Sequence, residues 1–320
     1  MKKRYAIHFS IIMILAVLLS ACGKTTSEST QTGQSGTITI SGAFALYPMM
    51  TRWAEEYQKL YPDVQFDVSA GGAGKGLTDA LAGAVDIGMV SRTVTQEEQD
   101  KGAYPIAVTK DAVFPVINSS NPAYSEIMAQ GITRDMFIKI FITGEITTWG
   151  EVIGDPSVVD EIHVYTRSDA CGAAEMWAKF MGGVQDDLVG IGVNADPGIL
   201  QAVISDPLGI GYNNLGYAFD LSTGLPTAGA TAVPIDLNEN RTADPDEVAD
   251  TLETAVELIA SEKYPSPPAR LEFLVTNGKP EGLVQNFIVW ILTDGQSFVA
   301  EAGYVQLTDV QIEESLGLVR

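Results

Sequence analysis

A short stretch of the chain, YTRSDACGAAEMW at 165–177, gathers residue types that are suited to binding a charged ligand. Arg167 and Asp169 precede a run of small residues, where a helix would present free backbone N–H groups. A helix start of this kind favours anions, because the N–H groups and the helix dipole both attract negative charge. Cys171, one of two cysteines in 320 residues, stands at the centre. The pattern indicates an anion-binding corner that contains a lone thiol.

Two more turns of the same type precede expected helices, SGAFALYP at 41–48 and SAGGAGKG at 69–76. Ser91 and Arg92 end a further expected strand. One glycine-rich turn usually reflects only backbone geometry. Several such turns, each followed by a helix, make an anion site the better interpretation.

The elements that would position these turns alternate between strand and helix. Hydrophobic periodicity predicts strands at 36–44, 86–92, 111–122 and 161–167, a strand that runs into the glycine-rich turn over 63–76, and helices at 46–62, 77–85 and 132–143. This alternation predicts an α/β fold with parallel sheets, in which ligands bind where strand ends meet helix starts. About 284 residues follow the N-terminal segments. Because a single hydrophobic core rarely serves a chain of that length, we expect two lobes.

The N-terminus predicts export. Residues 1–21 combine a basic start with a short apolar core, which is typical of a secretory signal peptide. The letters Leu-Ser-Ala-Cys at 19–22 resemble a bacterial lipobox, which implies lipidation of Cys22; an ordinary signal with a chance cysteine is the alternative. Residues 22–36 are polar and predict a flexible tether. The expected location is therefore the outer face of the cytoplasmic membrane, at the cell surface or in the periplasm, with the lipid as anchor.

The acidic composition limits the partners. The formal charge is −22, and removal of the signal with Lys2, Lys3 and Arg4 takes it to −25. Such a charge argues against nucleic acid as a partner. It leaves a small anion open, because small-anion sites use local dipoles and hydrogen bonds. If Cys22 carries lipid, Cys171 has no intrachain partner, so no disulfide framework is expected.

The order of the motifs resembles the phosphate-binding lipoproteins of ABC-type phosphate importers. The resemblance covers 37–310 and rests on SGAFALYPMM, VSAGGAGKGL, GAVDIGMVSR, TRSDACGAAEMW, GIGYNNLGYAF and YPSPPARLEFLVTNGKP in that order. It implies the type II periplasmic-binding fold, an α/β architecture with two lobes and a ligand cleft between them. The lobes would be 37–117 with 265–320, and 118–264. It also implies a monomer that delivers a small oxyanion, phosphate above all, to ABC permease subunits and catalyses no reaction.

The resemblance also implies the ligand-binding residues, which carry over one by one. They are Leu46, Tyr47, Gly72, Ala73, Gly74, Ser91, Arg92, Arg167, Asp169, Cys171, Gly172 and Ala173. This sequence departs from the family where hydroxyl residues belong: Leu46 lacks the usual hydroxyl, Ala73 replaces a serine, and Cys171 and Ala173 replace Ser and Thr. Because a hydrogen bond to a charged group contributes about 1.5–3 kcal/mol, such losses predict weaker phosphate binding or a different anion.

Alternatives remain for three of these residues. Arg167 could pair with Asp169 on the surface instead of binding a ligand, and Arg92 could be a solvated strand end. Cys171 could donate weakly to the ligand, replace serine by size, or serve a ligand chosen for thiol chemistry. The helix start and Arg167 are expected to lower its pKa, although a bound anion would favour the neutral thiol.

A second cluster of oxygen ligands lies in IDLNENRTADPDEV at 235–248. Its members occupy positions 1, 3, 5, 7, 9 and 12 of an EF-hand-type loop, and they are Asp236, Asn238, Asn240, Thr242, Asp244 and Glu247. Arg241 stands at position 6, where glycine is usual, and a helix is expected to leave directly from Glu247. The loop predicts either a structural calcium site or a solvated acidic loop. No other cofactor is expected.

An enzyme is not expected. His163 is the one histidine after the signal and lies in an expected strand, and no Ser/His/Asp order, CxxC pair or Walker loop occurs. A binding protein for another anion, or a sensor or adhesin with the same fold, remains an alternative to a transport component.

Overall fold

The structure, a computed structural model, describes residues 33–320. The expected signal peptide (1–21), the lipidation site Cys22 and most of the expected tether (22–36) lie outside the described residues. Those assignments stay predictions. Within the described range, no helix is both long and apolar enough to cross a membrane.

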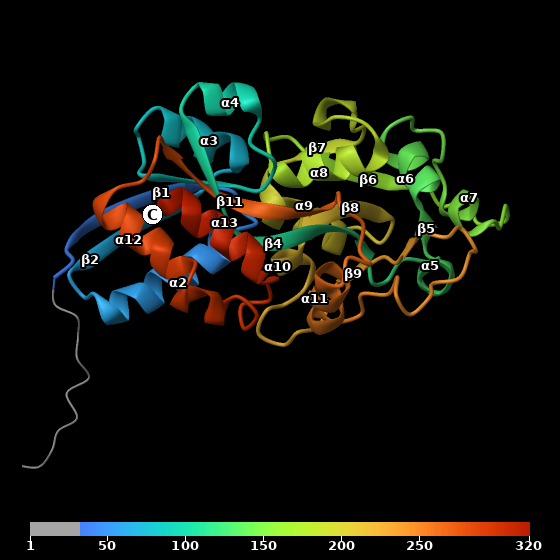
Figure 1. The fold of residues 1–320 in the computed structure, drawn as a ribbon. Coiled ribbons are helices and arrows are strands. Elements are labelled where there is room, and N and C mark those ends of the chain that lie inside the picture. The colour runs from blue at the N-terminus through green and yellow to red at the C-terminus, as the bar shows by residue number, and fades with distance from the viewer. Residues whose placement is uncertain (1–32) are drawn as a thin grey trace, which may run out of the picture. The chain divides into compact units, whose positions relative to one another are not determined.

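Nine of the described strands form one mixed sheet, in the order β2-β1-β3-β11-β4-β8-β6-β7 with β9 beside β4 (Figure 1). β5 and β10 pair separately. The strand bounds are β1 Gly36–Gly42, β2 Val64–Ala70, β3 Ile87–Val90, β4 Ala103–Asn118, β5 Ile132–Thr133, β6 His163–Arg167, β7 Ile191–Val193, β8 Gly209–Asn214, β9 Ala230–Ala232, β10 Ile235–Asp236 and β11 Ala269–Asn277.

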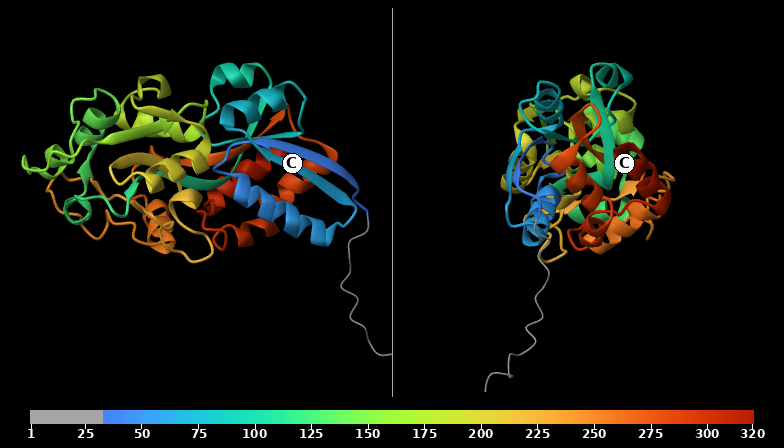
Figure 2. Two further views of the ribbon diagram at one scale, coloured as in Figure 1. Left: turned by 180° about the vertical axis from the view of Figure 1, so that it is seen from behind. Right: turned by 60° about the vertical axis from the view of Figure 1, so that its left-hand side comes forward.

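The helices alternate with these strands along the chain. Their bounds are α2 Tyr47–Leu60, α3 Ala73–Leu81, α4 Gln96–Asp100, α5 Tyr124–Gln130, α6 Arg134–Phe141, α7 Trp149–Ile153, α8 Gly172–Met181, α9 Ala195–Ser205, α10 Leu215–Ala218, α11 Leu252–Ala260, α12 Gly282–Ile291 and α13 Asp309–Val319, with 3₁₀ turns η1 Gln185–Asp187 and η2 Asp294–Phe298. α3 and α4 cover one face of the β1–β3 part of the sheet, and α2, α12 and α13 cover the other (Figures 1 and 2).

The strand directions confirm the expected α/β class. β1 pairs in parallel with β2 and β3, and β6 pairs in parallel with β7 and β8. The two long strands β4 and β11 are antiparallel to each other and stand between these parallel groups. Each parallel group is thus the sheet of one lobe, and β4 and β11 cross from one lobe to the other.

The buried apolar side chains divide at this crossing. One core, the first-lobe core, takes Ile106 and Val108 from β4 and Leu274 and Val275 from β11. The other, the second-lobe core, takes β4 from Ala112 onward and the start of β11. Between the two cores, β4 and β11 carry buried polar side chains instead of apolar ones.

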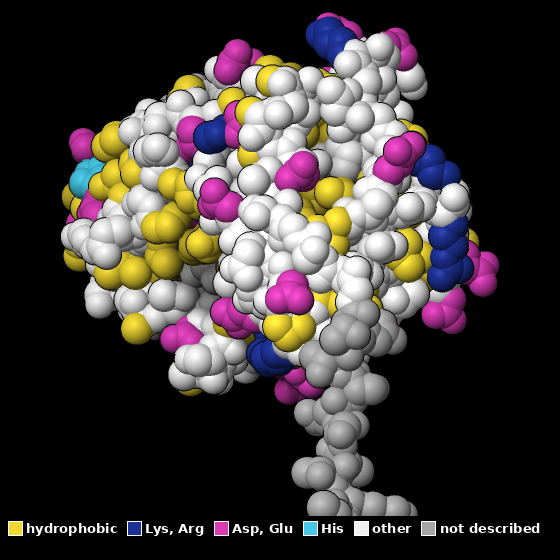
Figure 3. Space-filling view, turned by 90° about the vertical axis from the view of Figure 1, so that its left-hand side faces the viewer, with side chains coloured by type: hydrophobic (Ala, Val, Ile, Leu, Met, Phe, Trp, Pro, Cys, Tyr) yellow, Lys and Arg dark blue, Asp and Glu magenta, His cyan; other side chains and the backbone are white. Residues whose placement is uncertain are grey.

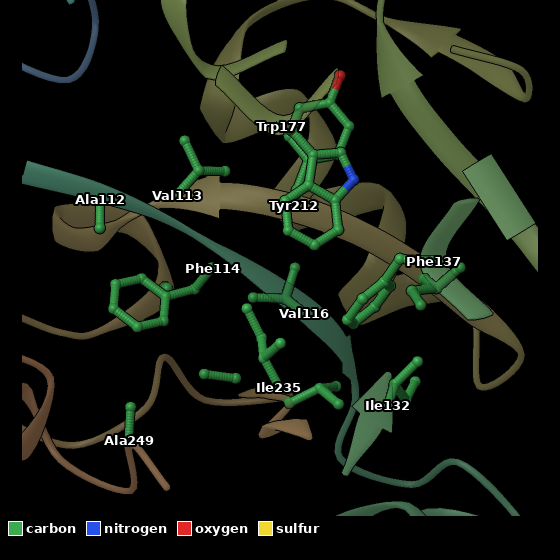
Figure 4. Close-up of a cluster of buried hydrophobic side chains, with 14 of the residues drawn as sticks. Ala112, Val113, Phe114, Val116, Ile132, Phe137, Trp177, Tyr212, Ile235 and Ala249 are labelled. Carbon is green, nitrogen blue, oxygen red and sulfur yellow. The ribbon is translucent and has the colours of Figure 1, made fainter. Parts of the chain in front are cut away.

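The second-lobe core packs aromatic rings from α6, α8 and β8 against aliphatic side chains of β4 (Figure 4). The ring of Phe137 lies edge-on to Trp177, and the ring of Trp177 stacks on Tyr212 with centroids 6.0 Å apart. The Tyr212 hydroxyl contacts Thr166 Oγ1 and accepts the Arg167 N–H. This core therefore also fixes the end of β6, where the candidate site begins.

Two predicted helices begin at different residues in the structure. α3 starts at Ala73 and not at 77, because its glycines let it pack onto the strands: a Cβ on Gly76 would lie 2.7 Å from Gly42 Cα. α11 starts at Leu252, where the Thr251 side chain accepts the Thr254 N–H, and not directly at Glu247. The EF-hand-like exit helix expected after Glu247 is therefore wrong.

Acidic side chains spread over the first-lobe face in Figure 3, and the basic side chains there lie beside acidic ones. The first lobe carries ion pairs of this kind, such as Arg52–Glu56 on α2 and Lys101–Glu97 at the end of α4. Exposed pairs of this kind contribute little stability. They leave no extended basic surface on this face, in keeping with the net charge.

Candidate anion-binding site

The turns that the sequence predicts at a ligand site meet in the structure. The turn before α3 lies against the turn before α8: a Cβ on Gly72 would be 3.0 Å from the Ala170 carbonyl oxygen, and one on Gly74 would be 3.4 Å from Ala170 Cβ. The turn before α2 also takes part, because the Phe44 ring centroid lies 5.6 Å from Arg167 Cζ. Turns from the first lobe therefore converge on the Arg167 turn of the second lobe.

The end of β3 meets the start of α8 even more closely. A Cβ on Gly172 would lie 2.2 Å from both the carbonyl and the hydroxyl oxygen of Ser91. Any side chain at this position would push the two lobes apart, so the contact requires glycine. Ser91 itself is buried.

Arg167 is buried and paired, not on the surface. Its Nε donates to Asp169 Oδ1 at 2.8 Å and one Nη2 hydrogen goes to Asp169 Oδ2 at 2.6 Å. Its Nη1 donates to Asp196 Oδ2 at 2.6 Å. Arg167 is 5 % exposed and Asp196 is 1 % exposed. A guanidinium has five N–H donors, so one hydrogen on each terminal nitrogen remains for a ligand.

Arg167 keeps its positive charge, and Asp169 keeps its negative charge. Burial opposes the charge of Arg167, but the Asp169 hydrogen bonds and the Asp196 charge raise the pKa of Arg167 further above its ordinary value. Burial also works to raise the pKa of Asp169, yet the donors Arg167 and Ala195 N–H hold that pKa below its usual range. Burial raises the pKa of Asp196, against the effect of Arg167. Because two carboxylates already balance the arginine, an anion here would depend on hydrogen bonds and helix dipoles rather than on net charge.

Two helix starts offer those hydrogen bonds. Gly72 precedes α3 and has no side chain, and among the described residues no side chain caps this helix. At α8 the Cys171 thiol accepts the Ala174 N–H at 3.4 Å, so within residues 33–320 the N–H groups of Gly172 and Ala173 have no partner. The start of α3 lies against Asp169 and Ala170, in the same turn that leads from Arg167 to α8. The arrangement can bind a small anion between the lobes.

Cys171 is buried, and the pKa of its thiol is raised, not lowered as the helix start and Arg167 led us to expect. Burial raises the pKa of the Cys171 thiol to about 12, against the lowering effect of Arg167. The expected lowering of this pKa is therefore wrong, because desolvation of a thiolate costs more than the nearby arginine recovers. The Cys171 N–H donates to Gln185 Oε1 at 3.2 Å, which holds the turn in place.

We expect Cys171 to resist alkylation in the folded protein. A neutral, buried thiol offers almost no thiolate to a reagent such as iodoacetamide at neutral pH. Mass spectrometry should show labelling slower than that of the denatured protein by at least about a hundredfold. Equal labelling rates for folded and denatured protein would contradict the buried position.

The side chains of Leu46, Ala73 and Ala173 contain no hydrogen-bond donor. Leu46, Ala73 and Ala173 are buried, and Leu46 packs in the first-lobe core. The Tyr47 N–H donates to the Phe44 carbonyl at 3.3 Å, so it already serves the turn. The aromatic ring against Arg167 is therefore Phe44, which the sequence analysis did not single out.

Arg92 forms ion pairs with two carboxylates, Glu98 and Glu175. Its Nη1 and Nη2 donate to the two carboxylate oxygens of Glu98 at 3.0 and 2.8 Å, and its Nε lies 3.1 Å from Glu175 Oε2. Glu98 belongs to the first lobe and Glu175 to α8 of the second. Arg92 is thus neither a free ligand donor nor a solvated strand end here, but part of an ion pair between lobes.

Four further residues belong to this site and escaped the sequence analysis. Asp196 lies in the first turn of α9, and Asn214, at the end of β8, donates to Asp196 Oδ1 at 2.6 Å. Gln185 Nε2 donates to the Asp169 carbonyl at 2.7 Å. Tyr217 lies close enough to Asp196, Arg167 and Tyr47 to interact electrostatically, and burial raises its pKa. No helix was predicted from the sequence at α9, so Asp196 carried no local signal of this role.

In the 236–247 loop, Asp236 and Glu247 turn their carboxylates toward the backbone of the loop, and the Asp244 carboxylate accepts the side-chain amides of Asn238 and Asn240. Asp236 accepts the Asn240 and Arg241 N–H groups at 3.2 and 2.9 Å, and Glu247 accepts the Leu237 and Asp244 N–H groups at 2.7 and 3.1 Å. Arg241 adopts φ +60° and reaches the Gln130 side chain and the Ile153 carbonyl, which takes its charge out of the loop. Among the described residues, no three acidic, histidine or cysteine side chains form a group that could hold a metal.

Calcium binding by this loop stays a prediction. We expect 1 mM-scale Ca²⁺ to raise the melting temperature relative to a chelator, because the cation would replace backbone N–H groups as partner of both carboxylates. The same amount of Mg²⁺ is the control, since Mg²⁺ demands octahedral geometry at shorter distances. Glu247→Ala should remove the calcium effect. Equal melting temperatures with Ca²⁺ and chelator would refute the site.

Comparison with known proteins gives a family match and whole-length relatives. The model described as "PBP superfamily domain" matches residues 27–295. The phosphate-binding protein PstS of Bacillus subtilis (strain 168) is 26 % identical over 322 residues, which covers 98 % of this chain and 97 % of that protein. The PstS of Methanocaldococcus jannaschii is 25 % identical over 364 residues, with 96 % and 93 % covered.

Solved structures share the fold. A crystal structure from Clostridium perfringens, described as a phosphate ABC transporter substrate-binding protein with bound phosphate, matches with a TM-score of 0.69 at 23 % identity. The match covers 85 % of this chain and all of that one. At this identity the likeness establishes the two-lobe architecture, in agreement with the crossing strands and the two cores.

Proposed function

Because this chain belongs to the PBP superfamily, we propose that it is a solute-binding protein that captures phosphate and delivers it to an ABC importer. The observation that carries the proposal is the convergence of the turns before α2, α3 and α8 on Arg167. The names of the whole-length relatives support phosphate as the anion, since both are phosphate-binding proteins.

In this proposal the anion lies between the first turns of α3 and α8. The free N–H groups of Gly172 and Ala173 would donate from the second lobe, and the start of α3 would donate from the first. The remaining Arg167 hydrogens would complete the shell. Asp169 and Asp196 hold the guanidinium in place, so its orientation needs no further ordering when the ligand arrives.

Because donors come from both lobes, ligand binding and lobe closure are one event in this proposal. The ligand adds contacts that exist only when the lobes meet, so it shifts the population toward the closed arrangement. The Arg92–Glu175 pair adds an ion pair across the same boundary. An ABC permease would then recognise the closed form.

The proposal includes no catalytic step. His163 binds Asp206 at 2.6 Å, outside the turns around Arg167. The site supplies donors and a fixed positive group but no activated nucleophile, because burial keeps the Cys171 thiol protonated. The relatives are named as binding proteins, which supports this assignment.

We further propose that the protein is lipid-anchored through Cys22 outside the cytoplasmic membrane and acts as a monomer. The sequence of residues 1–36 supports the anchor, and the monomer follows from the family resemblance alone. Labelling of cells with a fatty-acid analogue should mark the wild-type protein, whereas Cys22→Ala should be unlabelled and released from the membrane fraction. Labelling of the variant would count against the anchor.

A second candidate is another oxyanion on the same site. The observation in its favour is that Ala73, Cys171 and Ala173 stand where the resembling family carries hydroxyl groups, so the site offers mainly backbone donors. A sensor or adhesin of this fold would bind in the same way but have no permease to serve.

A thermal-shift panel tests the function directly. Phosphate, phosphite, arsenate, sulfate, molybdate and small organic acids are compared at equal ionic strength. A ligand present at a hundred times its Kd stabilises the folded state by about 2.7 kcal/mol, a shift of several degrees. We expect phosphate to give the largest shift. A larger shift with another oxyanion would favour the second candidate, and no shift with any of them would refute the binding function.

A further inference from the structure

Arg270 lies on β11 at the crossing between the lobes, 8 % exposed. Its Nε donates to the Ser91 carbonyl at 3.2 Å, and its Nη2 donates to Asp111 Oδ2 at 3.3 Å and to the Asn214 side-chain oxygen. These three acceptors belong to three elements, the end of β3, β4 and β8. Arg270 therefore ties the first-lobe wall of the candidate site to the second lobe.

A continuous chain of side chains leads from Arg270 to Arg167. Asn214 accepts from Arg270 and donates through Nδ2 to Asp196 Oδ1 at 2.6 Å. Asp196 Oδ2 in turn accepts from Arg167 Nη1 at 2.6 Å. All four side chains are more than nine-tenths buried. Water does not compete with these bonds, so a shift of Arg270 moves Asp196 and with it the arginine of the site.

Two buried carboxyl groups share the single charge of Arg270. Asp111 accepts the Ala112 and Leu215 N–H groups as well as Arg270, so its negative charge is solvated by donors. Glu272 Oε1 lies 3.2 Å from Arg270 Nε, but the one hydrogen on Nε points to the Ser91 carbonyl. Within residues 33–320, neither Glu272 oxygen has a hydrogen-bond partner, and Glu272 is 0 % exposed.

Arg270 brings one positive charge to two buried carboxyl groups, so Asp111 and Glu272 are not both ionised. The groups that face Glu272 are Arg270 on its own strand, Asp111 on β4, Asp196 on α9 and Tyr304 after η2. Burial raises the pKa of Glu272 well above its ordinary value, against the pull of Arg270. Burial also raises the pKa of Asp111, to about 6. Because Asp111 has hydrogen-bond donors and Glu272 has none among the described residues, Glu272 is the carboxyl group of the two that takes the proton.

We propose that Arg270 is a positioning residue for anion binding, which holds Ser91 and Arg167 in register while Glu272 is protonated. The proposal rests on the phosphate site described above. When Glu272 loses its proton as the pH rises, the new carboxylate attracts Arg270 away from Ser91 and Asn214. Asp196 and Arg167 then lose their support, and the anion is held less tightly.

The test compares variants by phosphate titration calorimetry between about pH 6 and about pH 9. Arg270→Gln should weaken phosphate binding by about tenfold to a hundredfold at neutral pH. The matched control Arg52→Gln, an exposed arginine of α2, should bind as the wild type does. Asn214→Ala cuts the same chain while it keeps the charge of Arg270, and it carries the test if Arg270→Gln does not fold. Wild-type affinity in Asn214→Ala would overturn the proposal.

The pH profile separates positioning from a merely structural role. Phosphate ionises identically in every titration, so the ratio of wild-type to Glu272→Gln affinity reports Glu272 itself. This ratio should fall by about tenfold from neutral to alkaline pH. Parallel profiles for the two proteins would overturn the proposal.

A measurement without ligand tests the titration of Glu272 separately from the proposed phosphate binding. Because folding raises the pKa of Glu272 above its unfolded value, its contribution to stability is full at acidic pH and is lost as pH rises toward the folded pKa. The melting temperature of the wild type should therefore fall more steeply toward alkaline pH than that of Glu272→Gln. If no variant binds phosphate but this difference in slope remains, the proposed function fails and the titration of Glu272 stands. If the melting temperatures of the wild type and Glu272→Gln fall equally steeply with pH, the titration of Glu272 is refuted.

Discussion

Arg167→Ala is expected to abolish measurable phosphate binding. The substitution removes the buried cation on which the turns converge and leaves Asp169 and Asp196 facing the anion without compensation. Loss of charge-assisted bonds and the added repulsion together predict at least a hundredfold loss of affinity by calorimetry. Unchanged affinity would refute the site.

The same variant is expected to lose stability, which needs its own control. Removal of one partner from a buried pair typically costs about 3–5 kcal/mol, because Asp196 stays buried without Arg167. Arg167→Ala with Asp196→Asn should recover part of that stability and still not bind phosphate. Arg134→Ala is a matched control, since Arg134 also lies over a ring, Phe180, and bonds a carbonyl, yet it lies outside the converging turns.

Restoring three hydroxyl groups is expected to raise phosphate affinity. Ala73, Cys171 and Ala173 lie at the first turns of α3 and α8, and each hydroxyl that reaches the anion adds about 1.5–3 kcal/mol. Ala73→Ser, Cys171→Ser and Ala173→Ser together should tighten binding by on the order of a hundredfold, after allowance for tight packing. Serine is chosen at 173 because this buried position has little room.

Calorimetry of the single and combined variants measures this gain. Cys171→Ser is nearly isosteric and should keep the cap on the Ala174 N–H. Ala82→Ser, exposed at the far end of α3, is the control and should leave affinity unchanged. A combined variant that folds but binds phosphate no better than the wild type would mean that these positions do not face the anion.

The turns of the site could be predicted from the sequence because their signals are local. Glycine-rich stretches after strands, and an arginine before a run of small residues, mark helix starts without knowledge of the fold. The alternation of strands and helices likewise predicted the α/β class that the structure confirms.

The partners of Arg167 could not be predicted, because they come from distant segments. Asp196 is 29 residues away from Arg167, and Arg270 reaches Asn214 across 56 residues. Periodicity also placed the start of β4 at 111, eight residues late, because a strand that serves two cores has no single pattern of exposure. The predicted lowering of the Cys171 pKa was wrong for a similar reason: the burial of Cys171 depends on tertiary packing, which the local motif does not contain.

The crossing strands set how the two lobes can move. β4 and β11 pair along nine residue positions, with a bulge between Glu272 and Phe273, so the lobes are joined by a hydrogen-bonded ribbon and not by loose loops. Only over 269–272 is this ribbon two-stranded within the sheet, because β11 also pairs with β3 from Phe273 and β4 with β8 from Val113. A two-stranded stretch twists more readily than a wide sheet, and the bulge that ends it concentrates the twist there. Opening should therefore be a torsional deformation with a restoring force, which limits its amplitude and returns the empty protein toward a defined angle.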